Sequence, residues 1–231
     1  MKKEVNANVK MKALYLIFVS IVMLSCDSGE TFVTINPENS TYLEPFGERE
    51  YTYDSEGQVI DTIYHTIPPF YLTAHDGSII TDKTVKGKIY VADFFFTSCP
   101  SICPIMTSSM KVLHENTKDI EELLILSHTI DPERDTLAQL NKYIKAHELD
   151  TRDDWFFLYG SQEYVYEIGK DGYLINADVD KEAEGGFLHS EHFVLVDREG
   201  RIRGMYLGTS PEEVNQLEKD IRYLINVEYG E

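Results

Sequence analysis

The chain has 231 residues, a net charge of −19 and a hydrophobic content of 42%. This length suits one domain with some elaboration, and the hydrophobic content is enough for a sizeable core. The negative charge argues against a nucleic-acid-binding protein, which needs clustered positive charge. Pro and Gly are too few for a disordered chain.

The first 26 residues predict a lipoprotein signal peptide. Four lysines precede an apolar run over residues 13–24, which is short for a transmembrane helix but typical of a signal-peptide core. The run ends at Ser25-Cys26, a small residue before a cysteine, as in a bacterial lipobox. We therefore expect cleavage before Cys26, which would be lipidated and become the mature N-terminus. The protein would then lie in the bacterial cell envelope, anchored to a membrane and facing the periplasm. An uncleaved signal anchor is the alternative.

The part after the leader begins with polar sequence. Residues 27–50 predict a tether, and residues 51–231 a single domain. Within the domain, residues 50–64 alternate around Ser55-Glu56-Gly57, which indicates an N-terminal hairpin. An extended segment is expected at 67–71, and a tight turn at His75-Asp76-Gly77.

The core alternates strands and helices. Residues 88–96, KIYVADFFF, show little polar alternation, as expected for a buried strand. The remaining expected elements, in chain order, are a loop (97–100), a helix (101–116), a strand (122–129), a loop (131–135), a helix (136–147), a strand (155–159), a helix (162–170), a mixed acidic segment (171–188), a hairpin (192–197 with 202–206) and a last helix (211–227). This order is that of an α/β, thioredoxin-like fold, with a central sheet flanked by helices and the N-terminal hairpin as an extension.

Two cysteines are spaced C-x3-C at the end of the first core strand. Cys99 and Cys103 stand at a strand-to-helix junction, and positions i and i+4 of a helix face the same way. A helix N-terminus favours thiolate, and thiolate binds a soft metal such as Cu(I). The pair therefore predicts a metal or redox site, because a disulfide would close only a very short loop and stabilise little.

A third metal ligand should come from another loop at the same edge of the sheet. His114 and His147 lie on predicted helices and are expected at the surface, whereas His128 lies in an apolar strand and is expected to be a partly buried, hydrogen-bonded side chain. His189 stands just before a late strand, in a position that would face the cysteine loop. On position alone, His189 is the first candidate and His192 the second.

Three segments of the sequence resemble the signature regions of the Sco/SenC family, the copper proteins of cytochrome c oxidase assembly. They are GKIYVADFFFTSCPSICPIMTSSM, SHTIDPERDT and FLHSEHFVLVDREGRIRGMY, and the similarity runs from about residue 67 to the C-terminus. The resemblance implies that Cys99, Cys103 and His189 bind copper. Many family members have an aspartate directly before this histidine, whereas this chain has Leu188.

The resemblance also implies that Asp131, in the second segment, lies near the site and supports it. Loop and helix-cap chemistry is the alternative role for the acidic residues of this segment, Asp135 in particular. Two thiolates and one imidazole would favour Cu(I) while still holding Cu(II), and binding would release protons.

The function that the resemblance implies is a copper chaperone. It would bind Cu(I) and Cu(II) and deliver copper to the CuA-bearing subunit of cytochrome c oxidase, or reduce the thiols of that site. Other copper chaperones and thioredoxin-like reductants are further expected partners. The membrane would be reached through the lipid anchor, and no nucleic-acid partner is expected.

Three other functions compete with this one. A thiol-disulfide oxidoreductase would use Cys99 and Cys103 as a redox pair, but thioredoxins have C-x2-C and a proline opposite the cysteines, and no proline occurs here between Pro132 and Pro211. A peroxiredoxin-like peroxidase fits poorly, since Thr97 lies two rather than three residues before the cysteine. A copper or redox sensor, or a module that only binds a partner, is the third. Enzymatic activity as a thiol-disulfide reductase is left open.

Overall fold

The computed structural model describes residues 43–175 and 190–230. All the described residues belong to one compact unit, Thr41–Glu231. Within the described residues, no helix combines the length and the apolar character needed to cross a membrane. The predicted leader, including Cys26, and the predicted third ligand His189 lie outside the described residues.

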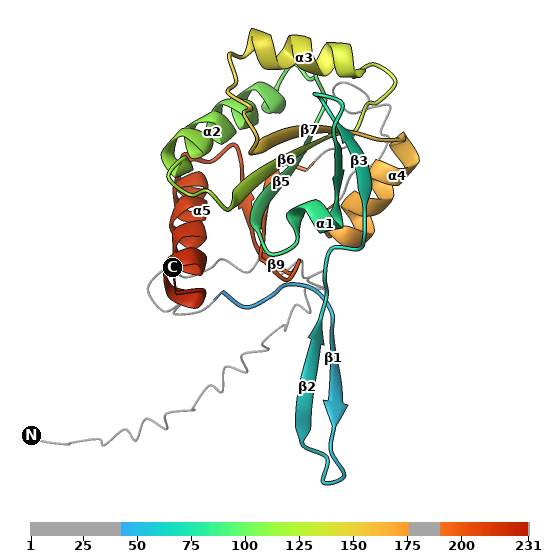
Figure 1. Ribbon diagram of the computed structural model, residues 1–231, viewed down its shortest axis with the longest axis vertical. Helices are drawn as coiled ribbons and strands as arrows, with labels where there is room; N and C mark the ends of the chain where they lie inside the picture. Colours follow the sequence, from blue (N-terminus) through green and yellow to red (C-terminus); the bar gives the residue numbers. More distant parts are fainter. Residues whose placement is uncertain (1–42, 176–189, 231) are drawn as a thin grey trace, which may run out of the picture. The chain divides into compact units, whose positions relative to one another are not determined.

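The described part begins with a two-stranded antiparallel hairpin, β1 (Arg49–Tyr53) and β2 (Val59–Tyr64), which projects from the rest of the fold (Figure 1). This confirms the predicted N-terminal hairpin. The turn between the strands contains Gly57 with φ +80°, a conformation that favours glycine. Large side chains stay exposed on the hairpin, namely Tyr51, Tyr53, Val59, Ile60 and Ile63.

The core is a seven-stranded mixed sheet in the order β4-β3-β7-β6-β5-β8-β9. Its three central strands, β5, β6 and β7, run parallel, whereas the outer strands join them antiparallel. The bounds of the strands are β3 (Tyr71–Ala74), β4 (Ile79–Thr81), β5 (Ile89–Phe95), β6 (Leu123–Thr129), β7 (Trp155–Tyr159), β8 (His192–Val196) and β9 (Ile202–Leu207). Every residue of β5 and β6 is buried, as the lack of regular polar alternation in these strands predicts.

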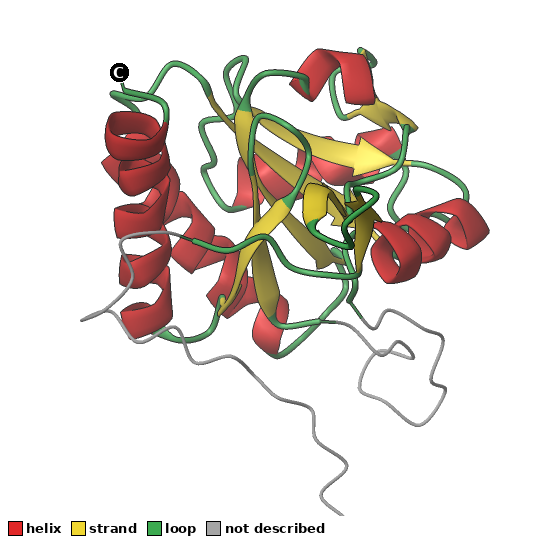
Figure 2. Cartoon of the chain, turned by 90° about the horizontal axis from the view of Figure 1, so that it is seen from below, coloured by secondary structure: helices red, strands yellow, loops and turns green. Residues whose placement is uncertain are grey.

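Helices cover both faces of the sheet (Figure 2). One face is covered by α2 (Ile102–Thr117), α3 (Leu137–Ala146) and α5 (Pro211–Tyr223), and the side chains of α3 reach α2 through a hydrogen bond of 2.6 Å between Thr107 and Tyr143. The short helix α4 (Gln162–Glu167) lies on the other side of the sheet in Figure 1. These layers confirm the predicted α/β, thioredoxin-like architecture.

Three features depart from the sequence-based expectations. β3 and β4 pair across the predicted turn at residues 75–77 and are followed by a short helix, α1 (Asp82–Val85), where only an extended segment and a turn were expected. The helix that starts at Gln162 changes to a π-helical turn at Ile168–Gly172, and α5 changes in the same way at Leu224–Glu228.

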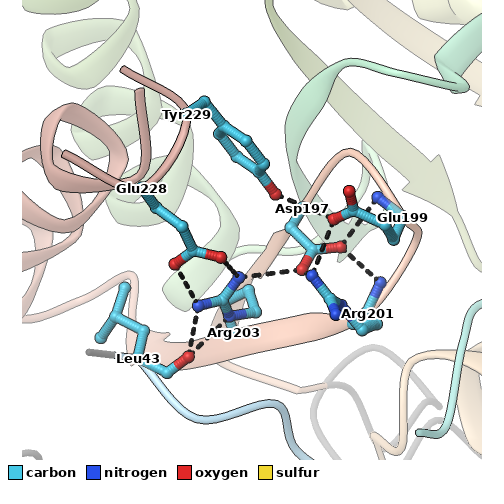
Figure 3. Close-up of polar contacts among 7 residues, drawn as sticks. All are labelled: Leu43, Asp197, Glu199, Arg201, Arg203, Glu228 and Tyr229. Carbon is cyan, nitrogen blue, oxygen red and sulfur yellow. Dashed lines mark hydrogen bonds and ion pairs between the residues drawn. The ribbon is translucent and has the colours of Figure 1, made fainter. Parts of the chain in front are cut away.

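A buried arginine joins the two ends of the described domain (Figure 3). Arg203 on β9 is 0% exposed and donates hydrogen bonds to the carbonyl of Leu43, to Glu228 at 2.8 and 2.6 Å, and to Asp197 at 2.9 Å. Asp197 also accepts a hydrogen bond of 2.8 Å from Arg201. Within this network, Arg203 and Asp197 each have a partner of opposite charge, as burial requires.

Candidate metal centre

The cysteine pair lies where β5 ends and α2 begins. Cys99 is 6% exposed and Cys103 is 1% exposed, and both are free thiols. The backbone N–H of Cys103 donates to Sγ of Cys99 at 3.4 Å, and the backbone N–H of Cys99 donates to the carbonyl of Phe96 at 3.2 Å. Cys99 Sγ therefore lies at the N-terminus of the helix, where free N–H groups favour negative charge on sulfur.

The two thiols have different environments. The hydrogen bond with Cys99 raises the pKa of the Cys103 thiol strongly, and burial and the nearby Asp93 raise it further. In the metal-free protein Cys103 therefore keeps its proton and donates it toward Cys99. A metal that binds both sulfurs has to displace this proton.

Asp135 supports the loop between β5 and α2, residues 96–101, through hydrogen bonds, and this segment is called the cysteine loop below. The fully buried carboxylate accepts from the backbone N–H of Thr97 at 2.9 Å, from the Thr97 hydroxyl at 2.5 Å and from the Thr129 hydroxyl at 2.6 Å. Burial raises the pKa of Asp135, while these hydrogen bonds lower it. The helix-cap role considered for Asp135 belongs instead to Thr136, whose hydroxyl accepts from the backbone N–H of Gln139.

Asp131, the residue that the resemblance singled out, is also buried but has other partners. It is 3% exposed, its carboxylate pairs with Arg134 at 3.1 Å, and its backbone N–H donates to the Thr129 hydroxyl at 3.2 Å. The hydrogen bonds from the cysteine loop go to Asp135, four residues later. The signal for this lay in the segment SHTIDPERDT, which contains both acids, but the segment alone does not say which carboxylate turns toward Thr97.

The other histidines considered as ligands have their own partners in the fold. His114 was expected at the surface, and this is wrong: it is 4% exposed, lies 3.0 Å from Asp154 and packs against the Trp155 ring, because it falls on the inner face of α2. His147 is half-buried against Tyr143. His192, at the start of β8, bonds the Ser190 hydroxyl at 3.0 Å.

His128 is buried more completely than the sequence suggested. It stacks on Phe94 and donates from Nδ1 to the carbonyl of Asp93 at 3.2 Å, while Nε2 has no hydrogen-bond partner among the described residues. Burial lowers its pKa to about 4, so the ring is neutral. It lies on the face of the sheet opposite to Asp93 and α2, which sets it apart from the cysteine pair.

No group of three or more metal-ligating side chains occurs within residues 43–175 and 190–230. Of the three predicted ligands, the described part of the chain contains Cys99 and Cys103, and His189 lies outside it. The donor set that is present fits a soft metal ion: two adjacent sulfurs at a helix N-terminus, in a largely dry environment.

Comparison with known proteins places this site in a family. The SCO1/SenC family model matches residues 59–226. The SCO1 protein homolog of Bacillus subtilis is 32% identical over 168 residues, which cover 71% of this chain and 86% of that protein.

Two solved structures give the same assignment. A SCO1/SenC family lipoprotein from Bacillus anthracis is 30% identical with a TM-score of 0.64, over 70% of this chain and 95% of that one. Bradyrhizobium japonicum ScoI with copper bound is also 30% identical, with a TM-score of 0.55, over 69% of this chain and 99% of that one.

The Sco family is one of cytochrome c oxidase assembly proteins, and a disulfide switch has been identified in one member, BsSco. The fold, the three sequence segments and the family match over most of the domain agree with one another. The chain therefore belongs to the SCO1/SenC family.

Proposed function

We propose that this protein binds copper through Cys99, Cys103 and His189 and delivers it to the CuA site of a cytochrome c oxidase. The observation that carries the proposal is the position of the two reduced cysteines. Both cysteines lie at the N-terminus of α2, where the Cys103 backbone N–H donates to the sulfur of Cys99. A copper-bound relative with the same fold supports the choice of metal.

Copper is cargo here, so the site has to bind it and also release it. Two thiolates suit Cu(I), and an imidazole adds a nitrogen ligand that Cu(II) accepts. Three protein ligands leave a position at which a receiving protein can bind before the donor releases the metal. Oxidation of Cys99 and Cys103 to a disulfide would remove both sulfur ligands, which links copper release to thiol redox state.

The location of the protein forms part of the proposal. Lipidation at Cys26 would hold the domain at a membrane of the bacterial envelope, facing the periplasm, with residues 27–50 as the predicted tether. Within that range, Leu43 and Phe46 already form hydrogen bonds to β9. A SCO1/SenC relative is a lipoprotein, which supports this. Labelling with a radioactive fatty acid, lost in Cys26→Ser, tests the anchor.

Anaerobic titration of the purified full-length protein with Cu(I) and Cu(II) tests the metal site. Wild type should bind one equivalent, and Cys99→Ser or Cys103→Ser should lose most of the affinity. His189→Ala should weaken Cu(II) binding, whereas His192→Ala, a matched change three residues away, should not. If reduced wild type binds no copper at one equivalent, the proposal fails; if His189→Ala binds both ions like wild type, the third ligand is wrong.

A thiol-disulfide reductase is the second candidate function, favoured by the contrast between the two sulfurs. Cys103 holds its proton while Cys99 Sγ accepts the helix N–H, the arrangement of an attacking sulfur and a resolving thiol. Reduction of a disulfide in a CuA-domain substrate, coupled to a thiol reductant, would test this. The activity should disappear in both cysteine variants and persist in His189→Ala.

A further inference from the structure

The segment SHTIDPERDT contains three acidic residues. Among the hydrogen bonds of the described residues, only Asp135 of these three bonds to the cysteine loop. It is 0% exposed, and its two oxygens accept three hydrogen bonds. Two come from Thr97, which stands two residues before Cys99, and one comes from Thr129 at the end of β6. A carboxylate this deeply buried is stable only with such partners.

The three contacts join separate parts of the fold. Thr97 belongs to the loop after β5, Thr129 ends β6, and Asp135 precedes α3. The side-chain amide of Gln139, in the first turn of α3, donates to the Thr97 hydroxyl at 3.1 Å, which adds a fourth contact to this network. Thr97 therefore has its backbone N–H and its hydroxyl held by groups that lie around α3.

We propose that Asp135 is a positioning residue for the cysteine loop, which holds Cys99 at the N-terminus of α2 by fixing Thr97. The proposal rests on the proposed function, in that Cys99 is taken as a functional sulfur, but it concerns the loop and not the metal. Because Thr97 is fixed at its N–H and at its hydroxyl, the chain leaves β5 in one direction. Two residues later Cys99 reaches the position at which its sulfur accepts the Cys103 N–H.

Helix capping does not explain the burial of Asp135, because Thr136 caps α3. An ion pair does not explain it either, since the described cation closest in sequence, Arg134, pairs with Asp131. What the carboxylate does contact is the loop that carries Cys99. Its loss would leave the Thr97 N–H without its acceptor in a half-buried loop, and the loop would open more often.

The rate at which iodoacetamide alkylates Cys99 in the reduced, copper-free full-length protein tests the proposal, with the modified peptide identified by mass spectrometry. Thr97→Val keeps the side-chain shape but removes the hydroxyl, and with it the hydrogen bonds to Asp135 and from Gln139. The loss of even one bond of about 1 kcal/mol corresponds to about fivefold faster reaction. Asp135→Ala removes all three bonds and should react at least tenfold faster. Asp135→Asn, which keeps one acceptor oxygen, should fall between wild type and Asp135→Ala.

Thr117→Val is the matched control. Thr117 is more deeply buried than Thr97, and its hydroxyl donates to the Leu113 carbonyl at 2.8 Å near the far end of α2, away from the cysteines. This variant should keep the wild-type alkylation rate. If Thr97→Val accelerates the reaction less than threefold, or no more than Thr117→Val does, the proposal is overturned. Thr97→Val decides the matter even if Asp135→Ala does not fold.

Copper titration of the same variants separates this proposal from the proposed function. Thr97→Val should bind Cu(I) about fivefold more weakly than wild type, because the sulfurs spend less time in place. If wild type binds no copper, the proposed function fails, while the alkylation rates still decide the role of Asp135. If copper binds and Thr97→Val matches wild type in both measurements, the positioning role fails alone.

Discussion

Asp93 is a carboxyl group buried in the middle of β5, on the side of the sheet that faces α2 and α3. It is 5% exposed and accepts a hydrogen bond of 2.6 Å from Ser127, whose hydroxyl in turn accepts one of 3.0 Å from Trp155. Burial raises the pKa of Asp93 to about 7. The titratable groups that face it, Cys103 and Tyr143, have raised pKa values themselves and stay neutral near pH 7.

This environment predicts a pH-dependent gain in stability for Asp93→Asn. An unfolded aspartate titrates near 3.8 and the folded one near 7, so the folded state holds the proton more tightly. The protonated form therefore stabilises the fold below about pH 4, and this contribution is lost as the pH rises to 7. Asparagine avoids the loss and still accepts from Ser127, so the variant should gain, relative to wild type, a few kcal/mol between pH 4 and pH 8.

Urea denaturation at several pH values measures this gain. Asp119→Asn is the control, since Asp119 is exposed and Arg222 lowers rather than raises its pKa. That variant should show no gain as the pH rises. A stability difference between Asp93→Asn and wild type that stays constant from pH 4 to pH 8 would contradict the assignment of the raised pKa.

Between elements, β9 and α5 are joined through Tyr206. Its hydroxyl donates to Asp220 on α5 at 2.8 Å, and both side chains are buried. The tyrosine ring lies directly over Gly204 on the same strand: a Cβ at Gly204 would come within 2.6 Å of Cε2 and Cζ of Tyr206. Glycine is therefore required at position 204 because the Tyr206 ring lies so close, and not because of the backbone φ angle of Gly204.

Gly204→Ala should accordingly lower the free energy of unfolding by more than the loss of the hydrogen bond between Tyr206 and Asp220 alone. The added methyl displaces the Tyr206 ring and breaks its bond to Asp220, for a loss of about 2–4 kcal/mol in the free energy of unfolding. Tyr206→Phe removes only the hydroxyl and should cost about 1 kcal/mol. Chemical denaturation of both variants checks this, and equal costs would show that the ring has room to move.

Sequence patterns predicted the elements whose signal is local. Alternation around Ser55-Glu56-Gly57 indicated the hairpin, and the apolar run at 88–96 indicated β5. The strands β3 and β4 were missed because they have only four and three residues. β4 pairs with β3, and β3 joins the sheet by pairing with β7, about 85 residues further along. A pairing at such a distance leaves no periodic pattern in either short segment.

The same distinction applies to the site. The C-x3-C spacing predicted that both sulfurs would face one spot, on the expectation that both cysteines stand on one helix. The structure starts α2 at Ile102, so Cys99 lies in the loop before the helix, and its sulfur is placed at the helix N-terminus by that loop. Whether Asp131 or Asp135 would support the cysteine loop was not predictable, because the answer depends on where β5 and β6 place Thr97 and Thr129. His114 was misassigned for a similar reason: the side of α2 that meets Trp155 is decided by packing.

At the scale of the whole described domain, Arg203 connects the first described residue, Leu43, to the last turn of the domain at Glu228 (Figure 3). One guanidinium holds the Leu43 carbonyl, Asp197 and Glu228. Arg203→Ala leaves Asp197 buried without this partner and should cost about 3–5 kcal/mol in the free energy of unfolding. Arg222→Ala is the control, because Arg222 pairs with Asp119 and Glu218 at the surface and should cost less than about 1 kcal/mol.

Denaturation curves give both costs, and amide hydrogen exchange locates them. Exchange in Arg203→Ala should accelerate most at Phe46, whose backbone N–H donates to the Ile202 carbonyl at 2.8 Å. A cost for Arg203→Ala as small as that for Arg222→Ala would mean that the buried network adds nothing to stability beyond a surface ion pair.

The arginine network also determines how the domain would respond to a mechanical pull. Tension on the chain ahead of Leu43 reaches the domain at Arg203 on β9, the edge strand of the sheet, and next at the bond from Phe46 to Ile202. The cysteine loop leaves from β5, with β8 between it and that edge. If tension acts through the segment ahead of Leu43, the hydrogen bonds at the edge strand β9 would therefore break first, and the cysteine loop would keep its geometry while they do so.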